Sequence, residues 1–125
     1  MLTDMDRLAQ EQSWDMLTMS DEDRNEILRS RVKAGIALLN EREWSEPWFM
    51  KINLDRLDIH SGQNCVLGQL FDTGDYSYSA DGYAKGLHEL GLTIGIGHGF
   101  SGNWSAQLTE IWTDEIRQLR ENHVQ

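Results

Sequence analysis

Residues 52–71, INLDRLDIHSGQNCVLGQLF, decide the fold because they form the densest apolar run and lie between two long helical patterns. The second half of the segment has apolar residues at helical spacing, which predicts a short helix over 64–71. Ser61 or Asn64 is the expected cap, since either side chain accepts a hydrogen bond from a first-turn amide. Gly68 costs about 1 kcal/mol relative to Ala inside a helix, so its presence indicates a closely packed neighbouring backbone.

Two strongly periodic patterns flank this segment. Ser20 and the three acids after it are a strong helix start, and apolar residues then recur every three or four positions, predicting a helix over 21–42. The same spacing predicts a second long helix over 103–122, and a shorter one over 80–90 that stops at Gly91. We therefore expect a mostly α fold: a compact small helical domain with two long helices, short helices and irregular glycine-rich loops.

The first 19 residues have a weaker pattern than the rest of the chain. The length of 125 residues fits one domain. We expect residues 1–19 to be an N-terminal helix or a mobile arm, and residues 20–125 to be a single helical domain. An exposed apolar cluster in the arm is a candidate surface for binding a partner, and its residues are Trp14, Met16, Leu17 and Met19.

Several residues of the two predicted long helices indicate which surfaces are packed and where charge lies. Gly35 lies on the apolar side of the first long helix, which indicates close approach of another helix. Arg29, Arg31 and Lys33 are expected outside, as a basic band. Glu115 shares the apolar face of the last helix, so it would need a partner such as Arg29 or Arg31 if buried. That position favours a structural ion pair over an acid catalyst.

The charge of the chain restricts its partners. Twenty-one acidic residues oppose 11 basic ones, giving a net charge of −10. Binding nucleic acid requires a basic face, and so does binding anionic membranes, so we expect neither. One cysteine, no apolar run of about 20 residues and no export signal predict a soluble cytoplasmic protein.

A cysteine and two histidines are the only candidates for catalysis. A cysteine nucleophile needs a histidine to hold the thiolate, and Cys65, His60 and His98 could provide this set with Asp58. Such a site would suit a small hydrolase or transferase. Cys65 is followed by apolar residues, however, and a cysteine in such a run is more often a small core residue.

No cofactor or metal is predicted. The four candidate ligands of a zinc site, His60, Cys65, His98 and Asp58, include no closely spaced pair. The acids of the turn-rich residues 72–82 lack the spacing of a calcium loop. The glycines of residues 92–102 lack the preceding strand and later ribose-binding acid of a dinucleotide site.

Parts of the chain resemble small uncharacterised proteins encoded by actinobacteria and their phages. The resemblance lies in KINLDRLDI (51–59), NCVLGQLF (64–71), Gly99-Phe100 and the pattern of tryptophan, isoleucine and leucine over 108–120. It covers roughly residues 32–121, and NCVLGQLF is its most specific part. The resemblance implies a phage accessory protein that acts on a host component. That family has no established activity, so no site residue is carried over.

The sequence thus favours a non-enzymatic small acidic protein that binds a protein partner. One alternative is the small Cys–His hydrolase or transferase. Another is a DNA-mimicking inhibitor of a DNA-binding protein, which needs acids spaced like phosphates along one face. The basic band argues against that second alternative.

Overall fold

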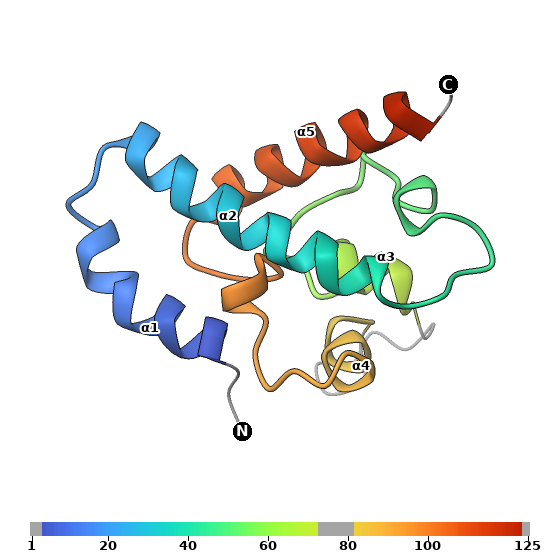
Figure 1. Ribbon diagram of the computed structural model, residues 1–125, viewed down its shortest axis with the longest axis horizontal. Helices are drawn as coiled ribbons and strands as arrows, with labels where there is room; N and C mark the ends of the chain where they lie inside the picture. Colours follow the sequence, from blue (N-terminus) through green and yellow to red (C-terminus); the bar gives the residue numbers. More distant parts are fainter. Residues whose placement is uncertain (1–3, 73–81, 124–125) are drawn as a thin grey trace.

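Two long helices, α2 (Asp21–Asn40) and α5 (Ser105–His123), pack against each other and form the frame of the molecule (Figure 1). The computed structural model describes residues 4–72 and 82–123, and within these ranges all regular structure is helical. The predicted mostly α class and the two long helices are confirmed, although α5 begins at Ser105 rather than at residue 103.

Two helix ends form with the capping residues that the sequence predicts, Ser20 and Gly91. The Ser20 hydroxyl accepts a hydrogen bond from the Asp23 amide at 3.1 Å, and the acids of the first turn face the positive end of α2. Helix α4 (Gly82–Glu89) is followed by Gly91, whose φ is +74°. The next amide, of Leu92, donates to the carbonyl of Leu87 at 2.8 Å, which closes the helix end as predicted.

Helix α3 (Val66–Leu70) packs on α4 through glycines. A β-carbon on Gly82 would collide with the backbone of Gly68, so the two helices touch backbone to backbone. A β-carbon on Gly68 would in turn collide with the backbone of Gly62 and Gln63, so the close approach predicted at Gly68 is confirmed, and the loop before α3 makes it.

The cap of α3 differs from the prediction. Cys65, rather than Ser61 or Asn64, is the N-cap, and its sulfur accepts a hydrogen bond from the Gly68 amide at 3.2 Å. The Ser61 hydroxyl instead accepts from the amides of Gln63 and Asn64. Ser61 thus closes the turn that precedes the helix, and the helix begins one turn later than a serine cap would give.

The glycine-rich segment 92–102 contains a short 3-10 helix, η2 (Ile96–His98), which packs against both α1 and α2. The carbonyl of His98 fills the space that a β-carbon on Gly35 would need. The close approach predicted at Gly35 is thus real: the backbone of η2 makes it, and the Trp112 ring of α5 lies 3.2 Å from the same β-carbon position. The indole N–H of Trp112 donates to the carbonyl of Gly99 at 2.7 Å and joins α5 to the same segment.

Residues at the N-terminus form a helix, α1 (Asp4–Met16), which packs against η2 (Figure 1). Ala9 and Met16 are 1% and 0% exposed. Arg31 of α2 donates to the Ala9 carbonyl and to the Met16 sulfur, each at 3.3 Å. Arg24 donates to the carbonyls of Met16 and Met19 and so satisfies the end of α1.

The expected basic band is therefore wrong at one position. Arg31 is 5% exposed, because α1 covers it, and this burial lowers the pKa of its guanidinium. Glu115 is 8% exposed, and its carboxylate lies 3.8 Å from the Arg29 guanidinium, in the pairing that the sequence suggested.

The central segment fills the remaining core. Helix η1 (Trp48–Met50) precedes it and contacts α5. Arg120 of α5 donates to the carbonyls of Phe49 and Ile52 and fixes where the segment enters the core. Its apolar side chains are almost all buried, namely those of Ile52, Leu57, Ile59, Cys65, Val66, Leu67, Leu70 and Phe71.

Replacing Gly35 by alanine should destabilise the protein. Helix propensity alone would add about 1 kcal/mol of stability, whereas forcing a methyl group into a packed core costs about 1–3 kcal/mol. The β-carbon meets the rigid backbone at His98, so we expect a net loss in urea denaturation. Ser30→Ala, exposed on the same helix, is the control and should change stability little. Unchanged or higher stability of Gly35→Ala would contradict the packing.

Arg31→Ala should release α1 while the rest of the fold persists. Hydrogen bonds from a charged donor contribute about 1.5–3 kcal/mol, so amide exchange in α1 should accelerate at least about tenfold. Lys33→Ala, exposed on the same helix, should leave α1 exchange unchanged. Equal acceleration in α1 and α5 would show that Arg31 stabilises the whole domain and not the docking of α1.

Candidate functional site

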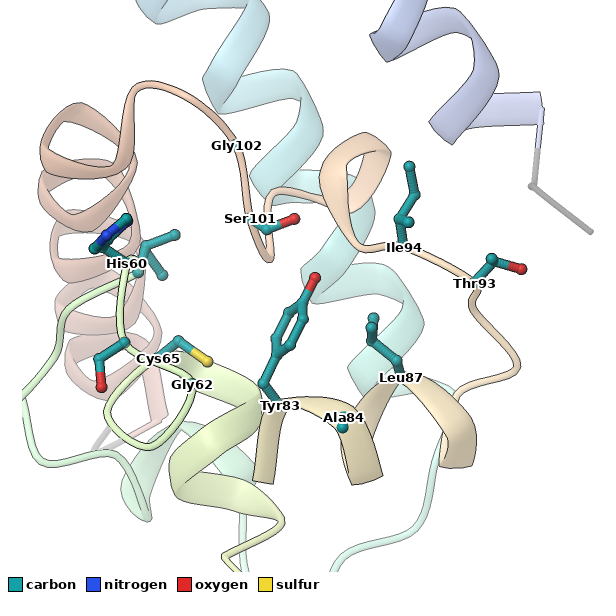
Figure 2. Close-up of a pocket in the computed structure, with 12 residues that line it drawn as sticks. His60, Gly62, Cys65, Tyr83, Ala84, Leu87, Thr93, Ile94, Ser101 and Gly102 are labelled. Atoms are coloured by element: carbon teal, nitrogen blue, oxygen red, sulfur yellow. The ribbon is translucent and has the colours of Figure 1, made fainter. Parts of the chain in front are cut away.

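A pocket of about 700 Å³ lies where three separate segments meet (Figure 2). The segments are residues 59–65, helix α4 and residues 93–102. The described residues that line the pocket are mainly apolar or uncharged: Ile59, His60, Ser61, Gly62, Cys65, Tyr83, Ala84, Leu87, Thr93, Ile94, Ser101 and Gly102.

Cys65 is 1% exposed and holds the start of α3. Figure 2 shows its sulfur directed toward the Tyr83 ring. The Gly68 amide donates a hydrogen bond to this sulfur at 3.2 Å. The same bond gives Cys65 a clear structural role, as the cap of a buried helix.

The two histidines do not assemble with Cys65 as a catalytic set requires. His60 is exposed at the pocket rim, and its ring is turned away from the Cys65 sulfur (Figure 2). The Asp58 carboxylate accepts a hydrogen bond from the His60 backbone amide at 2.9 Å, which makes a local turn. His98 lies in η2, stacked on Phe100 with ring centroids 6.4 Å apart, and is not among the described lining residues.

Sequence reasoning missed the other walls of the pocket. Tyr83 and Leu87 lie in the helix predicted over 80–90, and Ile94 and Ser101 lie in the glycine-rich residues 92–102. No local signal joins these segments to residues 59–65. In the structure, a backbone hydrogen bond from the Tyr83 amide to the Gly62 carbonyl, at 3.1 Å, joins α4 to that segment.

A second hollow, of about 640 Å³, lies between the first two turns of α2 and the first two turns of α5. Four carboxylates, two amides and one alanine form its described lining, which contains no basic side chain: Asp21, Glu22, Asn25, Glu26, Ala106, Gln107 and Glu110. We call this feature the acidic hollow. Arg24 lies beside it, 2.7 Å from the Asp21 carboxylate, and the Gln107 amide donates to the Asp21 carbonyl.

The docking of α1 changes which residues of the predicted N-terminal contact patch are exposed. Met16 is fully buried against Arg31, so it cannot contact a partner, and its candidacy is corrected. Leu17 remains 61% exposed, and Met19 is half-buried. The side chain of Trp14 lies outside the described part of the structure.

The described residues form neither a metal-binding cluster nor a membrane-spanning helix. Among them, no three histidine, cysteine, aspartate or glutamate side chains gather where they could hold a metal ion. No helix within the same ranges is long and apolar enough to cross a bilayer. Most of the acid-containing turn at 72–82 falls in residues 73–81, which the structure does not describe.

Comparisons with known proteins identify no relative. No family model matches the sequence, and no curated protein or solved structure matches it significantly.

Cys65→Ser should be more stable than Cys65→Ala, if capping is the main role of this residue. Serine keeps an acceptor for the Gly68 amide, whereas alanine removes it, and losing an N-cap acceptor costs about 1 kcal/mol. Urea denaturation of both variants measures the difference. Equal losses would show that the packing of the sulfur, rather than its hydrogen bond, holds this helix start.

Proposed function

We propose that this protein is a non-enzymatic binding protein that takes a basic segment of a partner protein into the acidic hollow. The observation that carries the proposal is the convergence of four carboxylates from two helices on one concave surface. A Lys or Arg side chain placed there would meet several acceptors at once, which favours charge-assisted hydrogen bonds.

Part of this acidic charge serves the helix itself. Asp21 and Glu22 lie in the first turn of α2, where acids stabilise the positive end of the helix dipole. Glu26 and Glu110 lie beyond the first turns of α2 and α5, where that benefit fades. Both side chains are exposed, so their carboxylates can reach a basic ligand.

The geometry supports this proposal more than the two alternatives. A Cys–His enzyme needs a base oriented toward the thiol, whereas the His60 ring turns away (Figure 2). His98 lies in η2. A DNA mimic needs an unbroken acidic face. Arg29 interrupts the acids of α5, lying 3.9 Å from Asp114 and 3.8 Å from Glu115.

The resemblance to phage and actinobacterial proteins gives the proposal its context. We propose a cytoplasmic phage accessory protein whose partner is a host protein with an exposed Lys- or Arg-rich segment. Nucleic acid is not the expected partner, because the net charge of −10 repels phosphates. Leu17, exposed in the turn that leads to Asp21, would add an apolar contact beside the acids.

Neutralising the two acids that do not help a helix end should weaken binding of a basic peptide. The probe is a capped peptide of alternating lysine and leucine, titrated at low salt and followed by amide chemical shifts. Shifts should concentrate in residues 21–26 and 106–110. The double variant Glu26→Gln, Glu110→Gln should bind about tenfold more weakly, because surface pairs contribute up to about 1 kcal/mol each.

The control is Glu41→Gln, Glu43→Gln, which removes the same charge from exposed positions outside the acidic hollow. This variant should bind the peptide nearly as well as the unchanged protein. Equal weakening in both variants would mean that only net charge attracts the peptide, and the proposal would fail. Shifts spread evenly over the surface would lead to the same conclusion.

A further inference from the structure

The pocket beside Cys65 has the size and lining of a small-molecule site, separate from the acidic hollow. Its volume of about 700 Å³ lies within the range of about 300–1,000 Å³ that is usual for ligand pockets. The described linings of the two features have no residue in common. An argument about this pocket therefore does not depend on the proposed protein partner.

The charge of the lining restricts the ligand. The chain has 21 acidic and 11 basic residues among 125, yet the described lining of this pocket holds none of them. His60 belongs to the lining, but it is exposed at the rim. An ionised ligand would lose water there without gaining a counter-charge, and that loss is costly. The pocket thus favours an uncharged ligand.

The inner surface combines apolar walls with a few polar groups. Ile59 and Cys65 are buried, and Leu87 and Ile94 are half-buried. Figure 2 shows the Tyr83 ring standing between the Cys65 side and the Leu87 side, with its hydroxyl directed toward the segment that carries Ser101. An aromatic face beside aliphatic side chains, with hydroxyl groups at one end, suits a flat apolar molecule that carries one polar group.

Backbone hydrogen bonds hold the walls of the pocket. The Tyr83 amide donates to the Gly62 carbonyl at 3.1 Å, which joins α4 to the loop before α3. The Phe100 amide donates to the Gly95 carbonyl at 2.9 Å, which fixes the opposite wall. A β-carbon on Gly95 would meet Phe100 and approach the Tyr83 hydroxyl, so glycine keeps that wall close without closing the pocket. A preformed pocket lowers the ordering cost of binding.

We propose that this pocket binds a small, uncharged, mainly apolar aromatic molecule, with its polar group near the hydroxyls of Tyr83 and Ser101. The molecule would lie between α4 and the 93–102 segment, and α3 would form the floor through Cys65. Binding is non-covalent, and Cys65 contributes a packed sulfur surface.

The test uses two dyes that differ by one charged group. N-phenyl-1-naphthylamine is uncharged, and 1-anilinonaphthalene-8-sulfonate is the same skeleton with a sulfonate. The uncharged dye should bind the full chain with one-to-one stoichiometry and gain fluorescence. The sulfonate should bind at least about tenfold more weakly, because the described lining offers it no cation. Absence of binding by the uncharged dye, or equal binding of both dyes, would overturn the proposal.

Methyl chemical shifts locate the dye without any substitution. The methyl groups of Ile59, Ala84, Leu87 and Ile94 line the pocket and should shift on titration with N-phenyl-1-naphthylamine. Ala106 lines the acidic hollow and provides an internal control that should not move. Shifts confined to other methyl groups would place the dye elsewhere and contradict the proposal.

A pocket-filling variant completes the test. Ala84→Phe adds a ring to the half-buried lining and should weaken dye binding at least about tenfold. Ala37→Phe adds the same ring at an exposed position of α2, outside both the pocket and the acidic hollow, and should bind as the unchanged protein does. Unchanged binding by a folded Ala84→Phe protein would overturn the proposal. Should that variant fail to fold, the methyl shifts of the unchanged protein decide.

Discussion

The contact between η2 and α2 at Gly35 is the constraint on which the rest of the structure depends. The His98 carbonyl occupies the place of a β-carbon on Gly35, and Gly99 lies against the backbone of Val32. The indole of Trp112 then donates to the Gly99 carbonyl at 2.7 Å. An irregular loop is thereby fixed between the two long helices, and α1 packs on its outer side. No bulkier residue at position 35 would allow this arrangement.

The fixed position of residues 93–102 also keeps the two candidate sites apart. Residues 93–102 become one wall of the uncharged pocket, with α4 and the turn at 59–65 as the others. The acidic hollow forms from the first two turns of α2 and the first two turns of α5 and needs none of these segments. A chain with a net charge of −10 thus keeps one surface rich in carboxylates and one cavity whose described lining has no formal charge. A protein of this size can in this way present two different binding chemistries.

Two differences between expectation and structure share one cause, the docking of α1. Arg31 was expected on an exposed basic band, and Met16 on a contact patch, but each buries the other. The spacing of apolar residues along the helices does not predict this contact, because it shows only which residues lie on the same face of one helix. Cys65 is a similar case. Its place in an apolar run indicated burial, whereas its role as a cap depends on where the preceding Ser61 turn ends.

The sequence by itself determined the helical class, the two long helices and the places where backbones approach at Gly35 and Gly68. These follow from apolar spacing, capping residues and the absence of a β-carbon, all of which act over a few residues. Only the tertiary structure decided what meets those glycines, and which residues gather at each site. Tyr83 and Ser101 reach the pocket of Cys65 through contacts between distant segments, and a single sequence carries no local signal for such contacts.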